Sequence, residues 1–220
     1  CDMRFTNNHW LSSLVSDIEA NPKSLICTAC VVFNEKEQVF ALRREHKSYG
    51  ATILFYHDYL TNPKKHKGFK GILEAKWQVK QSDTIYELPC ILGACYGVKK
   101  SWYEYIDGFW GHNRWGTLEP YISLKSWLFG GNCMIDPNIE TAHIFKKHGT
   151  HGVMQDSLIY NKLLVSRLLL PDDLGERMVA FLGSNPIVNR AKALWQTNEP
   201  KLLEKKAEYK SKITYNIEDF

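Results

Sequence analysis

The sequence lacks a long apolar run, an internal repeat and a strong excess of charge of one sign. None of its 220 residues belongs to a stretch of about twenty apolar residues, the length that a membrane-spanning helix needs. No signal-peptide pattern opens the chain either. These absences predict a water-soluble segment without a membrane span and leave open an anchor before residue 1. The apolar fraction of 44% is ordinary for a globular protein with a sizeable core.

A disulfide framework is also missing. Five of the six cysteines stand in apolar, strand-like surroundings rather than in the short loops of a small secreted domain: Cys27, Cys30, Cys90, Cys95 and Cys133. Cys27 and Cys30 have the spacing of zinc ligands, but no second pair answers them, and the run "LICTACVVF" is typical of a buried strand. We therefore expect reduced, buried thiols, and this cysteine usage favours a cytoplasmic protein.

The formal charge is only +4, and much of the excess lies in residues 62–71 and 201–212. Such runs are ordinarily a solvated loop and a polar helix, although a phosphate-rich partner is the alternative. The first five residues are typical of the end of a strand. We therefore expect the chain to be a segment of a longer protein.

Apolar periodicity predicts a mixed α/β protein. Residues 7–20 have helical spacing and stop at Asn21-Pro22, and "SLICTACVVF" follows as a strand. Further on we expect a strand ending at residues 93–95, a helix over residues 100–106, and two strands joined by a turn at residues 136–138. Helices dominate beyond residue 150. The expected domains are residues 1–150, with the chemistry, and a helical extension over residues 151–220.

Three candidate site features lie at the expected ends of strands or helices. Gly93 and Ala94 end a strand, Glu119 comes just after Trp115-Gly116 at the head of a helix, and His143 ends another strand before Lys146 and Lys147. Ligands of α/β folds collect at strand ends, and a carboxylate at a helix head is stabilised by the helix dipole. An imidazole beside two lysines suits a divalent metal next to phosphate. Each feature alone is as often structural.

The order of these motifs resembles the GT-A glycosyltransferases, and within them the polypeptide N-acetylgalactosaminyltransferases and related family 2 enzymes. The chain shows "LGACYGV", "YIDGF", "WGTLEPYISLKSWLFGG" and "AHIFKK" in the order of the corresponding family segments. The resemblance covers residues 1 to about 150. It implies the C-terminal portion of a Rossmann-like GT-A core, followed by a helical appendage, with the nucleotide-binding strands before residue 1.

The resemblance also implies roles for individual residues. Glu119 would be catalytic, although it falls one place after the glutamate of the family motif. His143 would ligate Mn²⁺ or Mg²⁺, with Asp2 beside the family's metal motif, which would lie before residue 1. Lys146 replaces an arginine that meets the donor diphosphate, and it keeps the charge without the bidentate fork. The donor-binding residues would be Gly93, Ala94, Trp115, Gly116 and Lys146.

The function so implied is metal-assisted transfer of a hexose or N-acetylhexosamine from a nucleotide-diphosphate donor, with a UDP-sugar as the expected donor, to an acceptor hydroxyl. The acceptor stays open between glycan, protein and modified nucleic acid, and the oligomeric state is unknown. The helices after residue 150 are more like microbial or viral relatives. Two alternatives remain: sugar transfer onto a nucleic-acid base, suggested by the basic, aromatic-bearing segment 64–70, and an inactive GT-A domain used as a binding module.

Overall fold

The apolar run that begins at Ser24 forms β2 (Ser24–Asn34), the central strand of the larger sheet. The computed structural model describes residues 3–34, 39–40, 47–55, 72–144 and 155–217. The chain divides into two compact units. The first consists of Cys1–Thr52, Lys76–Gly108 and Gly131–His151, and the second of Ile53–Ala75, Phe109–Gly130 and Gly152–Phe220.

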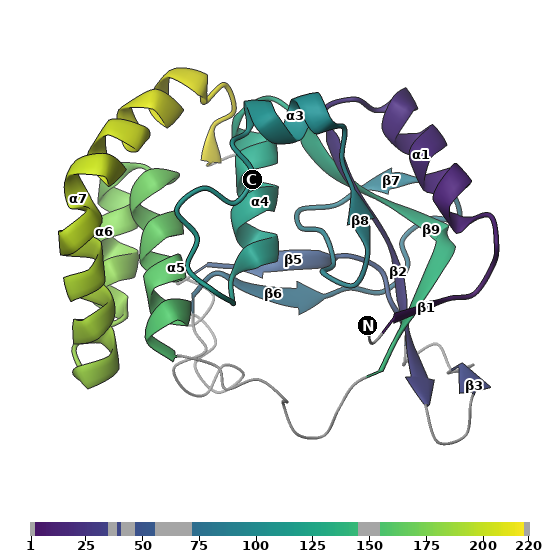
Figure 1. Cartoon of the computed structure of the whole chain (residues 1–220), viewed down its shortest axis with the longest axis horizontal. Coiled ribbons are helices and arrows are strands. Elements are labelled where there is room, and N and C mark those ends of the chain that lie inside the picture. Colours follow the sequence, from purple (N-terminus) through teal and green to yellow (C-terminus); the bar gives the residue numbers. More distant parts are fainter. Residues whose placement is uncertain (1–2, 35–38, 41–46, 56–71, 145–154, 218–220) are drawn as a thin grey trace. The chain divides into compact units, whose positions relative to one another are not determined.

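The first unit holds the larger sheet, which has seven strands among the described residues (Figure 1). β2 pairs in parallel with β9 (Asn132–His143), and β1 (Met3–Phe5) runs antiparallel along the other edge of β9. The shorter strands pair antiparallel with β2 or β9; they are β3 (Val39–Phe40), β4 (Lys47–Ser48), β7 (Tyr86–Glu87) and β8 (Tyr96–Gly97). Both parallel and antiparallel pairs therefore occur in one sheet.

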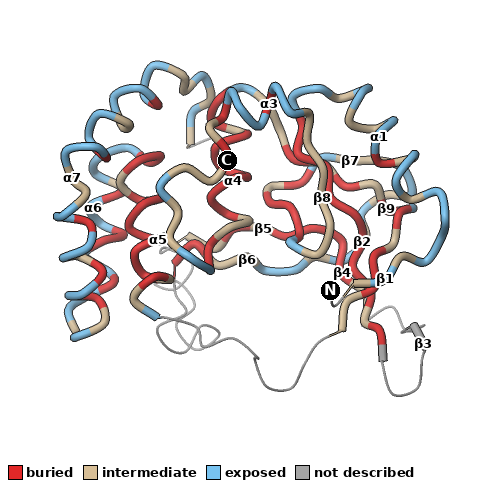
Figure 2. The backbone as a smooth tube through the Cα atoms, viewed as in Figure 1, coloured by how far each residue is buried: buried red, intermediate tan, exposed pale blue. Residues whose placement is uncertain are grey.

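Two helices belong to the same unit, α1 (Trp10–Ala20) and α3 (Lys100–Tyr105). α1 contacts β2 and β9, and its buried Leu14 packs with Ile26 and Ile139. Figure 2 shows both long strands buried along much of their length. The predicted helices at residues 7–20 and 100–106 and the strand after residue 23 are confirmed.

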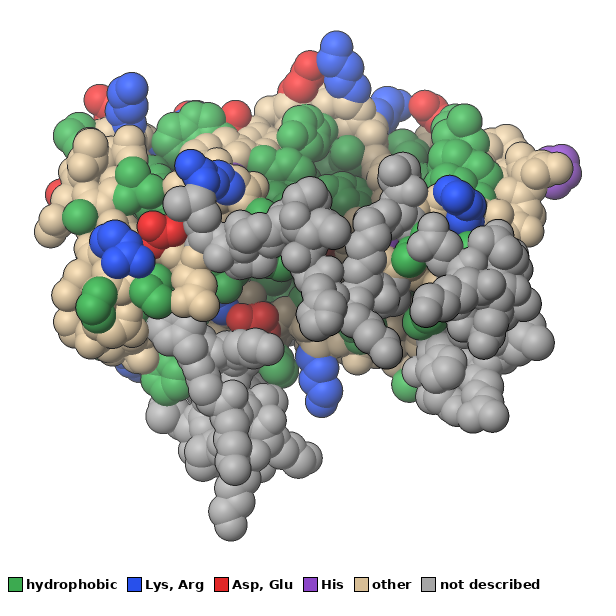
Figure 3. Space-filling view, turned by 60° about the horizontal axis from the view of Figure 1, so that its bottom comes forward, with side chains coloured by type: hydrophobic (Ala, Val, Ile, Leu, Met, Phe, Trp, Pro, Cys, Tyr) green, Lys and Arg blue, Asp and Glu red, His purple; other side chains and the backbone are tan. Residues whose placement is uncertain are grey.

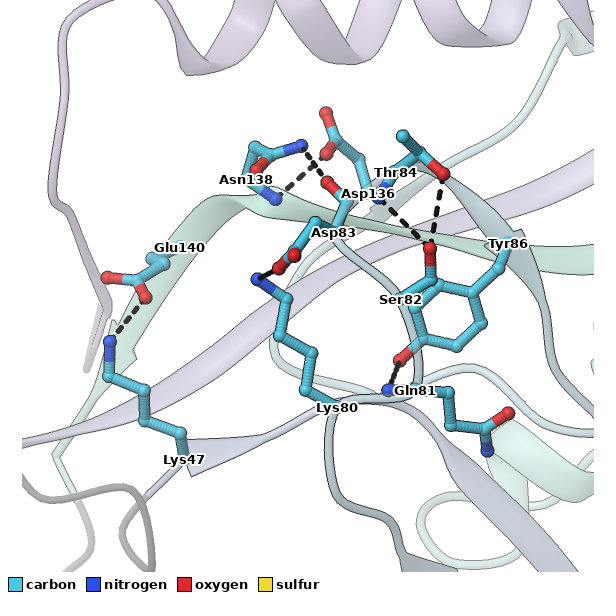
Figure 4. Close-up of polar contacts among 10 residues, drawn as sticks. All are labelled: Lys47, Lys80, Gln81, Ser82, Asp83, Thr84, Tyr86, Asp136, Asn138 and Glu140. Atoms are coloured by element: carbon cyan, nitrogen blue, oxygen red, sulfur yellow. Dashed lines mark hydrogen bonds and ion pairs between the residues drawn. The ribbon is translucent and has the colours of Figure 1, made fainter.

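The turn predicted at residues 136–138 is an irregularity within β9 rather than a break between strands. The register with β2 jumps from the pair Thr28–Asp136 to the pair Ala29–Glu140. The backbone amide of Asn138 donates to Asp136 Oδ1 at 2.8 Å, and its side chain donates to the carbonyl oxygen of Asp83 at 3.1 Å (Figure 4). These bonds stabilise the bulge, so the strand continues beyond it.

The prediction of a strand that ends at residues 93–95 is wrong. Cys90 makes an isolated bridge to Ala51, and residues 93–95 form a bend that leads into β8. Pro89 has no N–H to donate to a ladder, which disfavours a regular strand at that residue. Ile91 and Leu92 are buried as irregular chain instead.

The second unit is built from α4 (Leu118–Leu128), α5 (Gln155–Leu168), α6 (Asp172–Phe181) and α7 (Pro186–Lys212). α5 contacts both α6 and α7. Asn185 caps α7, and its side-chain oxygen accepts from the amides of Ile187 and Val188. A separate two-stranded sheet pairs β5 (Ala51–Leu54) with β6 (Glu74–Trp77).

A buried lysine ties α4 to α7 inside the second unit. Lys125 is 0% exposed, donates to the Tyr209 hydroxyl at 3.0 Å, and lies 4.8 Å from the ring centroids of Tyr121 and Tyr209. Its charge is therefore held by two aromatic faces and a hydroxyl. The helices after residue 150 thus share one compact unit with α4. The division into residues 1–150 and 151–220 stays a prediction, since the compact units follow other boundaries.

Candidate functional site

The head of α4 lines a cavity of about 790 Å³ in the second unit. Its walls come from four segments: residues 73–75, residues 115–120, the start of α5 and the start of α7. The polar groups among the lining residues belong to Glu74, Thr117, Glu119, Gln155 and Asn185. A cavity of this size, with apolar walls and a few polar groups, is what a small-molecule site requires.

Glu119 stands in the first turn of α4 and is half-buried. Burial raises the pKa of its carboxyl group above the usual value, and a hydrogen bond from its own backbone amide partly offsets this effect. A carboxyl group with a raised pKa can accept a proton more readily than an exposed one. The position is therefore chemically suited to orient or deprotonate a hydroxyl group.

Thr117 caps α4 with a left-handed backbone, at φ 61°. It is 8% exposed, and its Oγ1 is buried without a hydrogen-bond partner in the described structure. A left-handed conformation is unusual for a β-branched residue and costs of the order of 1–3 kcal/mol. Strain of this kind persists where the surrounding structure requires it, and here it occurs at a residue that lines the cavity.

Gly116 and Trp115 precede this cap. Gly116 has φ 105°, a conformation that favours glycine, and a Cβ atom added there would lie 2.4 Å from Leu158 Cδ1. Trp115 is 62% exposed and is one of the residues that line the cavity. The carbonyl oxygen of Gly116 lies 2.7 Å from His112 Nε2, and burial lowers the pKa of that histidine.

The structure brings together three of the predicted site residues: Trp115, Gly116 and Glu119 all line this cavity. Gly93, Ala94 and His143 belong to the first unit, where His143 ends β9 opposite Met3 and Val32. Asp2 and Lys146 lie outside the described residues. The roles given to all of these residues stay predictions.

Sequence reasoning missed Glu74 and Gln155, and it gave Thr117 no role of its own. Glu74 starts a short strand after a segment with no motif, and Gln155 opens a helix in the expected extension. Thr117 carried one available signal, because it directly follows Gly116 in the Trp-Gly turn at the helix head. Nothing local in the sequence marks the other two.

No group of three or more His, Cys, Asp or Glu side chains able to hold a metal occurs among the described residues. His143 supplies a single imidazole there. Cys27 and Cys30 are buried free thiols, and burial raises their pKa values to about 12 and about 11. Within the part of the chain that the structure describes, the residues do not by themselves complete a metal site.

The segment 64–70, which suggested a nucleic-acid partner, lies outside the described residues. On the face drawn in Figure 3 the described Lys and Arg side chains are scattered among the others. Residues 201–212, the other basic run, form the end of α7, as the polar-helix interpretation predicted. No described helix is both long and apolar enough to cross a membrane.

Known proteins share the fold of this chain and part of its sequence. No protein-family model matches the sequence. The crystal structure of GalNAc-T7 with UDP, GalNAc and Mn²⁺ is similar in fold, with a TM-score of 0.61 and 14% sequence identity over 90% of this chain and 37% of that one. The chain therefore has a fold like that of the GT-A glycosyltransferases. The α/β GT-A fold predicted from the motif order, with helices after it, is thereby confirmed.

Proteins similar in sequence are of the same kind as this structural neighbour. The chain is 26% identical to polypeptide N-acetylgalactosaminyltransferase 5 of Mus musculus over 69% of this chain and 16% of the relative. It is 20% identical to polypeptide N-acetylgalactosaminyltransferase 11 of Xenopus tropicalis, over 76% and 26%, and 23% identical to the probable N-acetylgalactosaminyltransferase 8 of Caenorhabditis elegans, over 80% and 39%. The chain thus spans well under half the length of these relatives.

The prediction of a cytoplasmic location is wrong. The relatives of the GT-A domain are polypeptide N-acetylgalactosaminyltransferases, which are enzymes of the Golgi lumen. The prediction was based on the expectation that the cysteines are reduced, buried thiols. The described cysteines lie in the core or at its edge, and such positions suit a free thiol as a small apolar side chain whatever the compartment.

Proposed function

We propose that this protein is a glycosyltransferase that moves a hexose or N-acetylhexosamine from a UDP-sugar to an acceptor hydroxyl group. The observation that carries the proposal is the half-buried Glu119 carboxyl group in the wall of a cavity of about 790 Å³, with Thr117 beside it. The names of the relatives, and the UDP and GalNAc in the similar crystal structure, support the choice of donor.

In such a transfer the bond between the anomeric carbon and the diphosphate oxygen breaks, and its electron pair leaves with the nucleoside diphosphate. The acceptor oxygen forms the new bond to the anomeric carbon and loses its proton. Glu119 would hold the acceptor hydroxyl by accepting its hydrogen bond. If the reaction inverts the anomeric centre, the same carboxylate takes the proton.

The donor-binding residues proposed from the resemblance keep their roles here: Gly93, Ala94, Trp115, Gly116 and Lys146. We likewise propose His143, with Asp2, as the contribution of this chain to a site for Mn²⁺ or Mg²⁺. A divalent metal would neutralise charge on the leaving diphosphate. Since the described residues do not complete such a site, no step above depends on it.

The test is turnover of UDP-sugars by the full-length protein, measured as UDP release with and without candidate acceptors. Glu119→Gln keeps the shape of the side chain and removes its basicity, so we expect transfer to fall by about 10²–10⁴-fold. Glu204→Gln, on the exposed side of α7, is the matched control and should leave transfer unchanged. Equal transfer by both variants would remove Glu119 from the mechanism, and no turnover of any UDP-sugar would remove the function.

The metal assignment has its own test. His143→Ala should weaken Mn²⁺ binding in calorimetry and raise the Mn²⁺ concentration needed for half-maximal UDP release. His9→Ala, which changes a solvent-exposed histidine before α1, is the control. A His143→Ala protein with the Mn²⁺ affinity and Mn²⁺ dependence of the wild type would show that His143 is no ligand.

A further inference from the structure

The turn that leads into Glu119 has a strained backbone. Arg114, Gly116 and Thr117 all have positive φ angles, of 55°, 105° and 61°. Two of these residues carry side chains, for which the left-handed region is unfavourable. An isolated chain would therefore leave this conformation, and something in the fold must hold it.

The side chain of Asn161 holds this turn. Asn161 lies on α5, is 0% exposed, and faces the backbone of residues 113–116. Its Oδ1 accepts from the backbone amide of Asn113 at 2.8 Å. Its Nδ2 donates to the carbonyl oxygens of Asn113, Trp115 and Gly116 at 2.9, 3.3 and 3.0 Å. One buried amide thus satisfies four backbone groups of a segment 45–48 positions away in the sequence.

The same face of α5 also fixes the turn by contact. Leu158 precedes Asn161 by three positions, so the two side chains lie on one side of the helix. Leu158 lines the cavity and occupies the space that a side chain at Gly116 would need. Packing and hydrogen bonding from one helix therefore fix where the turn ends, and the turn fixes where α4 begins.

We propose that Asn161 is a positioning residue for the sugar-transfer reaction, acting through the turn at residues 113–117 on Thr117 and Glu119. The inference rests on the proposed function for its reaction and on the described contacts for its mechanism. Without the Asn161 amide, the carbonyl groups of Asn113 and Trp115 lose this donor, and that of Gly116 keeps only His112 Nε2, so the strained residues relax. Glu119 lies two positions after Thr117, so relaxation of the turn would displace its carboxyl group. A displacement of about 1 Å at a reacting group can cost about 10²-fold in rate.

The test compares Asn161→Ala with Ser166→Ala. Ser166 lies on the same helix and is also 0% exposed. Its hydroxyl donates to the carbonyl oxygen of Lys162 at 2.8 Å, a bond within α5 that does not involve the turn at residues 113–117. Both variants lose buried hydrogen bonds, so Ser166→Ala reports the effect of loss of stability alone. We expect kcat for UDP-sugar transfer to fall about 10–100-fold in Asn161→Ala, with a small change in donor KM, and less than about threefold in Ser166→Ala.

Hydrogen exchange supplies a measurement that needs no substrate. The amide of Asn113 should exchange much faster in Asn161→Ala than in the wild type, with no such change in Ser166→Ala. Asn161→Asp serves if the alanine variant does not fold, because it keeps the shape and the oxygen that accepts from Asn113. It removes the donors to the carbonyl groups, so kcat should still fall while the Asn113 amide stays protected.

The outcomes separate the two proposals. If the wild type turns over UDP-sugars and Asn161→Ala and Asn161→Asp match Ser166→Ala in kcat, the positioning role is wrong and the function stands. If the wild type turns over no UDP-sugar, the function is wrong, and with it the catalytic consequence of Asn161. Unchanged exchange at Asn113 in Asn161→Ala would overturn the claim that Asn161 holds the turn.

Discussion

The Nζ atom of Lys162 lies 2.5 Å from Oε1 of Glu74, in the wall of the candidate site, and at the same distance from the carbonyl oxygen of Ile72. Lys162 is 1% exposed, whereas the Glu74 side chain is 36% exposed. A buried ammonium group thus depends on a half-exposed carboxylate. The two partners should consequently differ in what their removal costs.

We expect Glu74→Gln to destabilise the protein more than Lys162→Met. The first variant leaves a buried charge without its counter-ion, at a cost of about 2 kcal/mol once the exposure of Glu74 is allowed for, whereas the second removes the charge and fills its space. Burial lowers the pKa of Lys162 below its usual value, so the deficit of Glu74→Gln should shrink as the pH rises toward the alkaline range. Urea unfolding at several pH values measures both effects. A larger loss for Lys162→Met would contradict this account.

The raised pKa of Glu119 should be visible in stability. Between the usual pKa of 4.5 and its raised value, the folded protein holds a proton that the unfolded chain has released. The contribution of Glu119 to stability is therefore fully present at low pH and is lost as the pH rises through the folded pKa. Relative to the wild type, Glu119→Gln should gain thermal stability from pH 4 to pH 8. A difference in Tm that does not vary with pH would show that the carboxyl group is not perturbed.

Activity should respond to pH in the opposite direction. A general base must be ionised, so transfer by an inverting enzyme would rise as the pH passes the raised pKa of Glu119. Stability falls across the same interval. The same buried carboxyl group thus links function to a loss of stability, and the pH profile of kcat measures the functional side. A flat profile between pH 4 and pH 8 would count against base catalysis by Glu119.

Asp17 on α1 should make a second, separate contribution to the pH dependence of stability. Burial, followed by the charge and the hydrogen bond of Asp136, raises the pKa of its carboxyl group to about 6. Stability from this group is present below pH 3.8 and lost as the pH rises through 6. Asp17→Asn keeps a hydrogen-bond donor toward Asp136, so it should stabilise the protein by about 1 kcal/mol at pH 7.5, the figure being reduced for partial exposure. Glu19→Gln on the exposed face of α1 is the control, and an equal effect of both changes would refute the assignment.

Gly131 should tolerate no side chain. A Cβ atom there would lie 2.2 Å from the carbonyl oxygen of Lys23 and 2.5 Å from the Trp102 ring. Because one of these contacts is backbone, Gly131→Ala should cost about 2–3 kcal/mol. Gly183 has φ 68° with nothing within 4 Å of an added Cβ, so Gly183→Ala should cost only about 1 kcal/mol. Denaturant unfolding of both variants decides between clash and backbone conformation as the main cost.

Much of the fold could be predicted because its signals are local. β2 is an apolar run bounded by polar turns, α4 carries glycines at its head and tail, and Asn185-Pro186 marks the start of α7. The failures also have local causes. The apolar residues after Pro89 gave a strand signal, but the chain there is buried without a regular ladder. The cytoplasmic assignment failed because burial of a cysteine does not report its compartment.

The sequence alone determined the α/β elements, the order of the GT-A motifs and the carboxylate at the head of α4, since each depends on residues within a few turns of one another. Tertiary structure alone decided what surrounds that carboxylate. Asn161 reaches Asn113 across 48 positions, and Lys162 reaches Glu74 across 88. Which buried amide meets which strained turn depends on how α5 packs, and helix packing leaves no periodic pattern in the sequence that would identify the partners.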